Sequence, residues 1–380
     1  AMGGLVDYLD LTQRGKLPLL RPPLREDAES AMQIDASTRR NLEITQALSG
    51  GREGSLLAAV DRTATAAGAR LLERRLSSPS RDLSVIHERH AAVRSLVEQT
   101  ALREALRSDL RRVPDLDRAL SRIALDRGGP RDLAAIRAGL VQAESIAQRL
   151  VGTSGLLKSA AIALQGHEDL INLLDEALVA EPPMLARDGG FIALGYDSEL
   201  DETRRLRDEG RSVIAAMQTD FIAKTGVQSL KIKHNNVLGY FIETTSAHAE
   251  KMLAPPLSES FIHRQTTANQ VRFTTVELNE IETKILNAAN HALEIEKRHF
   301  AVLRAAILEQ AGPIGAAARG VAEIDVSAAF ADLAIVENWV EPKVDASRAF
   351  VVEAGRHPVV ERALRRQGGE VVPRLAVATG

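Results

Sequence analysis

The chain has 380 residues, a formal net charge of −3 and no cysteine. The lack of cysteine excludes disulfides, thiolate metal sites and cysteine nucleophiles. The near-neutral charge means that any nucleic-acid-binding surface has to be local. Aromatic residues make up only 3% of the chain, and this composition favours helices over sheets. No apolar run approaches the roughly 18 residues of a membrane span, so no membrane partner is expected.

Breakers and apolar spacing divide the first half of the chain. Residues 4–27 are expected to be irregular because Gly15, Pro18, Pro22 and Pro23 interrupt any long helix. Residues 55–76 predict one helix, which Ser55 can cap. Residues 83–150 predict helices of ordinary bundle length, and residues 152–195 predict short helices and loops.

Two longer helices are predicted further on, over residues 198–224 and 276–310. Each has an apolar stripe at helical spacing and a charged opposite face. At a rise of 1.5 Å per residue they are about 40–50 Å long. An antiparallel pair packed along these stripes is the arrangement that the pattern favours.

Between the two long helices, apolar and polar residues alternate in short runs. The predicted strands are residues 230–234, 237–244, 261–266 and 271–275. Asn235 and Asn236 can supply the first turn, since asparagine tolerates positive φ. A small β module is therefore predicted at the tip of the helical pair.

This tip module is locally basic. Six basic and three acidic side chains between residues 224 and 272 give it a balance of +3. Lys231, Lys233 and Asn235 share one strand face, because side chains alternate with period two. One interpretation is contact with a nucleic-acid backbone, to which Arg264 and its neighbours would add donors. The other is a solvated strand face on which lysines discourage edge pairing.

Enzyme and metal signatures are weak. His87 and His90 flank Glu88, but no third ligand is evident, so no metal site and no catalytic residue are assigned. Residues 350–352 and 375–378 predict buried strands of a further α/β domain. The second strand runs into Gly380, as a strand does at the start of a phosphate-binding loop.

Several strings in this order resemble the MutS family of DNA mismatch repair proteins. They are IDASTRRNLEI (34–44), TATAAGARLL (63–72), DLDRALSR (115–122), PRDL (130–133), LKI and GYFI (230–232 and 239–242), RQT (264–266) and GRHPVVE (355–361). The resemblance covers nearly the whole chain.

The resemblance implies a mainly α fold: a helical core bundle, a long antiparallel helical lever pair, a small β-rich clamp inserted at the lever tip, and the beginning of a truncated α/β ATPase domain. The implied domains are the end of a connector (1–27), the core and first lever helix (28–223), the clamp (224–275), the returning lever helix and core (276–345) and the start of the ATPase domain (346–380).

The family's function then implies backbone contact with double-stranded DNA, without sequence reading. The DNA-binding residues carried over are Lys231, Lys233, Asn235, Asn236, Arg264, Gln265, Thr266 and Asn269. The parent protein would be a P-loop ATPase that uses ATP and Mg²⁺, with Gly380 as the first glycine of its loop. It would form a homodimer, work with a MutL-type partner, and act in the bacterial cytoplasm at the nucleoid.

The family's mismatch-reading domain would precede this sequence, and its nucleotide loop and Mg²⁺ ligands would follow it. The resemblance therefore implies that this polypeptide holds no cofactor, does not hydrolyse ATP and does not select mismatches. The alternative is a helical scaffold whose tip module binds another protein.

Overall fold

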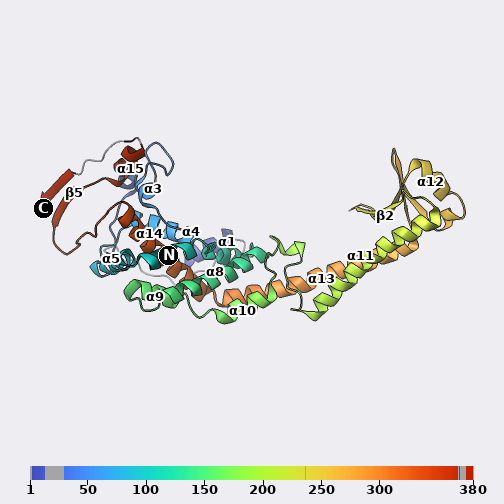
Figure 1. Ribbon diagram of the computed structural model, residues 1–380, viewed down its shortest axis with the longest axis horizontal. Helices are drawn as coiled ribbons and strands as arrows, with labels where there is room; N and C mark the ends of the chain where they lie inside the picture. The colour runs from blue at the N-terminus through green and yellow to red at the C-terminus, as the bar shows by residue number, and fades with distance from the viewer. Residues whose placement is uncertain (1, 13–29, 236, 367, 369–373, 380) are drawn as a thin grey trace. The chain divides into compact units, whose positions relative to one another are not determined.

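The computed structural model describes residues 2–12, 30–235, 237–366, 368 and 374–379 (Figure 1). The fold is mainly helical with a small antiparallel sheet, which confirms the predicted fold class. The chain forms two compact units. We call residues 1–175 with 303–380 the core unit, and residues 176–302 the hairpin unit.

Most of the core unit is a bundle of short helices. The helices of the core unit up to its boundary with the hairpin unit are α1 (Met2–Thr12), α2 (Ala36–Asn41), α3 (Leu56–Val60), α4 (Ala66–Ser77), α5 (Leu83–Glu98), α6 (Thr100–Leu110), α7 (Leu116–Ala124), α8 (Pro130–Arg149), α9 (Gly155–Ala163) and, at that boundary, α10 (Glu168–Ala177). Ser55 caps α3 as predicted, because its hydroxyl accepts a hydrogen bond from the backbone N–H of Ala58 at 3.1 Å.

The centre of this bundle is α14 (Ala311–Val336), which the sequence pattern does not predict as a helix: the predicted long helix ends at residue 310, and the residues that follow are assigned only to the core. It contacts α4, α5, α6, α7 and α9. Its apolar residues are buried around much of its circumference, and it carries many alanines that let neighbouring helices approach closely. Such a helix lacks a distinct polar face, so periodicity does not reveal it.

Two predictions for the first 80 residues are wrong. Residues 4–27 are not irregular throughout, because α1 extends to Thr12. Residues 55–76 do not form one helix, since the chain breaks between α3 and α4. The break is held by Asp325 of α14, whose carboxylate accepts hydrogen bonds from the backbone N–H of Ala64 at 2.9 Å and of Thr65 at 2.8 Å.

The C-terminal part of the core unit contains strand β5 (Ala349–Gly355), helix α15 (Pro358–Arg366) and strand β6 (Arg374–Thr379). Both predicted strands form, and they pair antiparallel. The prediction that they are buried is wrong for β5, because Phe350 is 60% exposed. The two-stranded ribbon offers little sheet surface to cover its own side chains. Helix α15 is held by Glu361, which accepts from Arg356 at 2.9 Å and from Arg365 at 2.5 Å. Gly380 lies outside the described residues.

The hairpin unit contains the predicted long helices, α11 (Ser198–Thr225) and α13 (Val276–Glu309), the second of which continues into the core unit. They run antiparallel, and a Cβ at Gly210 of α11 would lie 2.5 Å from Cγ1 of Ile285 of α13. A side chain at position 210 would therefore push the two helices apart. Before α11 lies the short 3-10 helix η1 (Ala186–Asp188).

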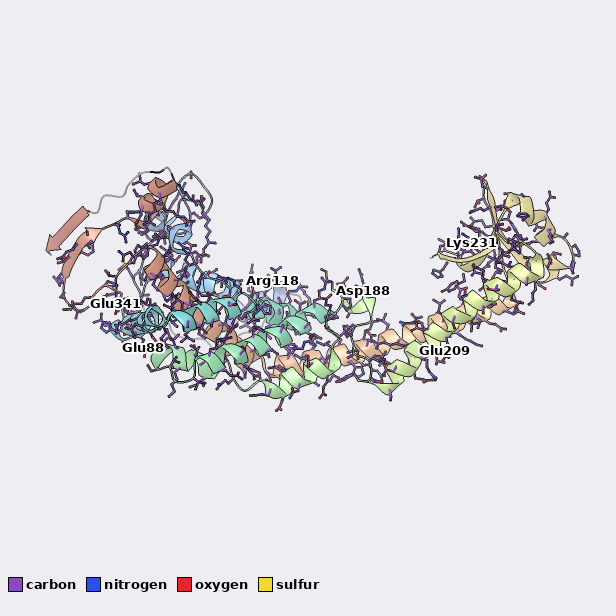
Figure 2. The ribbon with its side chains drawn as sticks, in the orientation of Figure 1. Glu88, Arg118, Asp188, Glu209, Lys231 and Glu341 are labelled. Carbon is purple, nitrogen blue, oxygen red and sulfur yellow. The ribbon has the colours of Figure 1, made fainter. Side chains whose placement is uncertain are left out.

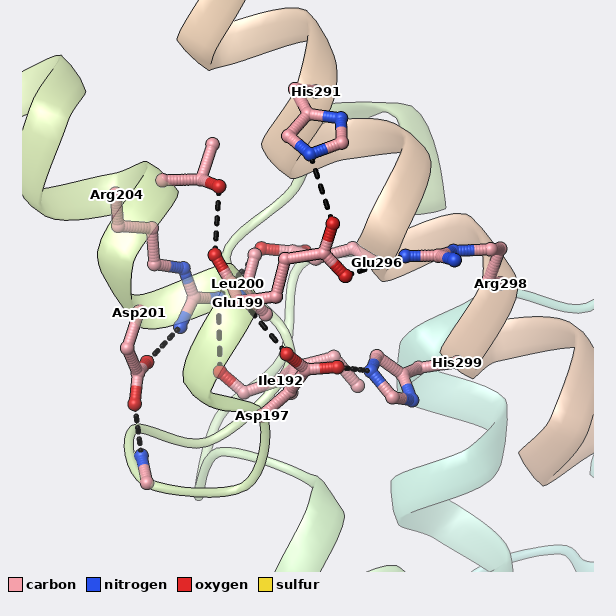
Figure 3. A network of polar contacts seen from close by, with 12 residues as sticks. Ile192, Asp197, Glu199, Leu200, Asp201, Arg204, His291, Glu296, Arg298 and His299 are labelled. Carbon is pink, nitrogen blue, oxygen red and sulfur yellow. Dashed lines mark hydrogen bonds and ion pairs between the residues drawn. The ribbon is translucent and has the colours of Figure 1, made fainter.

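A polar network joins the two long helices at the end remote from the sheet (Figure 3). The nearly buried carboxylate of Glu296 accepts from Nη2 of Arg204 at 2.6 Å. Asp197 caps α11 by accepting from the backbone N–H of Leu200, and it also bonds to Nε2 of His299 at 2.6 Å. The hydrogen bond from Leu200 is the largest cause, and the bond to His299 a further one, of a pKa of Asp197 below its ordinary value. The network fixes the register of the pair.

At the other end of the pair lies a four-stranded antiparallel sheet. Its elements are β1 (Lys231–Asn235), β2 (Gly239–Thr245), α12 (Ser246–Leu253), the 3-10 helix η2 (Leu257–Glu259), β3 (Ile262–Thr266) and β4 (Gln270–Thr274), and the strand order is β1-β2-β4-β3. The predicted β module is thus confirmed, with α12 as an addition. Ile242 and Phe273 on one face are buried against residues of α11, α12 and α13, such as Phe221 and Leu278.

Candidate nucleic-acid interface

The predicted binding residues lie on the two edge strands of the sheet and at one turn. Lys231, Lys233 and Asn235 are on β1 (Figure 2 labels Lys231), and Arg264, Gln265 and Thr266 are on β3, with Asn269 in the turn that follows. Asn236 lies outside the described residues. The edge strands are separated by β2 and β4, so residues that are distant in the sequence line the same sheet.

Strand register places four polar residues in one row across the sheet. Lys231 pairs with Glu243, Glu243 with Arg272, and Arg272 with Gln265. Directly opposed residues point to the same face, so this row lies on the face away from the hydrophobic core. At about 4.8 Å between strands, the row is about 14 Å long. Two of the four residues, Lys231 and Gln265, belong to the predicted set.

Glu243 is the electrostatic centre of this polar face. It is only 5% exposed, and it accepts a hydrogen bond from Nζ of Lys233 at 2.5 Å and from Nε of Arg272 at 3.3 Å. Burial disfavours the ionised carboxyl, but the two cations outweigh burial and hold the pKa of Glu243 below its ordinary value. The carboxylate and its two partners leave a net charge of +1.

An aromatic ring supports the arginine of this group. Phe241 is 3% exposed although it lies on the polar face, and the guanidinium of Arg272 sits 4.6 Å above the centre of its ring. A cation over an aromatic face is attracted by the ring's quadrupole. Nη1 of Arg272 also donates to Oε1 of Gln265 at 2.8 Å. The guanidinium is therefore fixed by three different side chains.

Two cations of the sheet are exposed and available to a ligand. Within the described part of the chain, the side chains of Lys231 and Arg264 form no hydrogen bond or ion pair. Arg264 occupies the register shift between His263 and Gln265, so it has no partner residue on β4. Together with the net charge around Glu243, they make this sheet locally positive.

Two other predicted residues, Asn235 and Thr266, form side-chain hydrogen bonds with their neighbours in the chain. Oδ1 of Asn235 accepts from the backbone N–H of Val237 at 2.9 Å and of Leu238 at 2.8 Å, so that oxygen holds the β1–β2 turn. Thr266 shares a hydrogen bond of 2.9 Å with His263. Asn235 is four residues along β1 from Lys231, about 13 Å away, and the structure does not gather it with the β3 residues.

Glu243 and Arg272 are functional candidates that were not predicted from the sequence. Both were counted in the local charge balance, and alternation within β4 could have placed Arg272 on the polar face. The pairing of Glu243 with both cations depends on strand register, which alternation alone does not give.

The structure offers no competing metal centre within the described residues, where no group of three His, Asp or Glu side chains could hold an ion. No helix among those residues has the length and apolarity needed to cross a bilayer.

Comparisons with known proteins agree on one family. The family model described as MutS domain III matches residues 37–331. The chain is 74% identical over 369 residues to the DNA mismatch repair protein MutS of Cereibacter sphaeroides, and 71% identical to that of Paracoccus denitrificans. It is 66% identical over 372 residues to the corresponding protein of Ruegeria pomeroyi. In each case the match covers 97% of this chain and 42% of the relative.

Proposed function

Because the chain belongs to the MutS family of DNA mismatch repair proteins, we propose that it is the part of such a protein that grips duplex DNA by its backbone. The observation that carries the proposal is the locally positive sheet, whose two edge strands carry exposed Lys231 and Arg264 on either side of a group of net charge +1. Cations and amide donors suit phosphate oxygens, which carry no sequence information. Backbone contact would serve a repair protein that meets DNA of every sequence.

The domain boundaries follow from the same premise. We assign residues 28–223 and 276–345 to the core and lever, residues 224–275 to the clamp, residues 1–27 to the end of a connector, and residues 346–380 to the start of an ATPase domain. The polar network between α11 and α13 supports a stiff helical pair, since it fixes their register at the end remote from the sheet.

The whole protein would couple nucleotide to DNA binding. In it, ATP and Mg²⁺ would bind to the ATPase domain, a second copy would supply the opposing clamp, and a MutL-type protein would respond to the complex. The setting would be the bacterial cytoplasm. The chain spans less than half the length of its curated relatives, so these activities belong to the proposal for the parent protein.

Charge reversal at the two exposed cations tests the backbone contact. At about 0.1 M salt, each phosphate contact contributes about 0.9 log unit of affinity, so losing two weakens binding about 60-fold. The variant Lys231→Glu with Arg264→Glu is expected to show this loss on duplexes of any sequence, measured by fluorescence anisotropy.

The matched control is Lys158→Glu with Lys343→Glu, which reverses two exposed cations of the core unit. It is expected to bind nearly as the unchanged chain does. Equal losses in both variants would mean that only overall charge matters. No binding of the duplex by the unchanged chain, even at low salt, would favour the protein-binding scaffold instead.

A further inference from the structure

We propose that Arg272 is a further phosphate-binding residue of the four-stranded sheet, and that Glu243 is a positioning residue that holds it ready. The inference rests on the proposed function. It adds one residue that makes contact with DNA and one that acts through it, neither of which the sequence analysis selected.

The contacts of Arg272 leave part of its guanidinium free. Nε bonds to Glu243 and Nη1 bonds to Gln265, while no described residue accepts a hydrogen bond from Nη2. The side chain is 22% exposed and lies on the polar face, between the exposed cations of the two edge strands. The free Nη2 is a charged donor of the kind that binds phosphate oxygens.

Glu243 explains why Arg272 is ordered before DNA arrives. A long arginine side chain loses rotamer freedom on binding unless other contacts have already fixed it. Here the carboxylate on one side, the amide of Gln265 on the other and the ring of Phe241 beneath leave little freedom to lose. The same carboxylate also holds Lys233, whose side chain remains 47% exposed.

A purely structural role makes a different prediction. If the network serves only to cover Phe241, replacing its members changes the stability of the sheet but not the number of ions released when DNA binds. The dependence of affinity on salt therefore separates a phosphate contact from a packing role.

The first test is Arg272→Gln, compared with Lys251→Gln, which removes an exposed charge on α12 of the same unit. For Arg272→Gln we expect the slope of log affinity against log salt to become shallower by about 0.9, as one phosphate contact is lost. Lys251→Gln is expected to leave the slope unchanged. Equal slopes for Arg272→Gln and the unchanged chain would overturn the assignment of Arg272.

The second test uses the sign of a charge change. Glu243→Gln makes the chain more positive by one, so simple attraction predicts tighter binding. Positioning predicts the opposite: a loss of about threefold to tenfold, as Arg272 and Lys233 regain their freedom. Glu250→Gln makes the same charge change at an exposed site on α12 and is expected to bind at least as well as the unchanged chain. If Glu243→Gln tightens binding as much as Glu250→Gln, Glu243 is not a positioning residue.

Hydrogen exchange over residues 231–274 checks that each variant keeps the sheet. If Glu243→Gln loses the sheet, the variant Arg272→Lys is measured in its place, because lysine keeps the positive charge but lacks the planar guanidinium. Arg272→Lys is expected to bind DNA several-fold more weakly than the unchanged chain. Binding by Arg272→Lys equal to that of the unchanged chain would then overturn the proposal. If the unchanged chain shows no salt-dependent binding at all, the proposed function itself fails, before any variant is compared.

Discussion

Removal of the Asp325 carboxylate is expected to be among the most damaging single changes in the core unit. Asp325 is fully buried in α14, and it accepts hydrogen bonds from the backbone N–H groups of Ala64 and Thr65 and, at 2.6 Å, from the hydroxyl of Thr65. Burial raises the pKa of Asp325 above its ordinary value, although these hydrogen bonds act in the opposite direction. Asp325→Ala leaves the donors of the α3–α4 break without a partner.

The magnitude follows from those contacts. Each lost hydrogen bond contributes about 1 kcal/mol, and a buried donor without a partner costs about 1–3 kcal/mol. We expect Asp325→Ala to lower the free energy of unfolding of the core unit by about 3–4 kcal/mol. Asp325→Asn keeps one accepting oxygen, so we expect a loss of about 1–2 kcal/mol.

Urea unfolding followed by tryptophan fluorescence measures the stability of the core unit. Trp339 is the single tryptophan of the chain and belongs to the core unit. The control is Glu309→Gln, which neutralises an exposed carboxylate in the same unit. If Asp325→Ala unfolds within 1 kcal/mol of this control, the reasoning that Asp325 holds the break between α3 and α4 is refuted.

Further predictions concern the hairpin unit and the effect of pH. Gly210→Ala is expected to destabilise the helical pair, because the added Cβ would meet Ile285. Gly312→Ala, which places its Cβ in open space on α14, is expected to be neutral or to stabilise the chain by up to about 1 kcal/mol. Thermal unfolding followed by circular dichroism compares the two variants. The lowered pKa of Glu243 means that its contribution to stability is complete above the ordinary value of 4.5 and is lost as the pH falls through the lowered value. The protection factors of residues 231–274 against hydrogen exchange, which correct for the slower intrinsic exchange in acid, should therefore fall as the pH is lowered. Glu243→Gln should abolish this pH dependence of protection. An unchanged pH dependence in that variant would assign it to another group.

The elements most accurately predicted are those governed by local patterns. The first long helix is predicted over residues 198–224 and spans Ser198–Thr225, because its apolar stripe and its charged opposite face can be read from residues a few positions apart. The β1 and β2 strands were likewise placed by alternation. These signals depend only on side chains a few residues apart.

The elements that the sequence did not reveal depend on distant partners. The break between α3 and α4 is fixed by Asp325, which lies 260 residues from Thr65. Helix α14 has no polar face because its neighbours cover it, and β5 was predicted to be buried without regard to what would cover it. Tertiary context decides such cases.

The candidate site shows the same division. Alternation predicts Lys231 and Lys233 on one face, and the strand pairing of β1 with β2 confirms it. It could not show that Lys233 is paired with Glu243, or that Oδ1 of Asn235 holds a turn, because both follow from how the hairpin closes. The resemblance to the MutS family is confirmed by the family match, whereas the individual DNA contacts stay predictions.

The most direct test of the proposed function is the binding of this chain to a labelled duplex of about 25–30 base pairs over a range of salt concentrations, with and without one mismatch. Affinity is expected to fall as salt rises, with a slope of about 0.9 for each phosphate contacted, and to be equal for the two duplexes. Binding that does not change with salt, or that prefers the mismatched duplex, would contradict a grip on the DNA backbone.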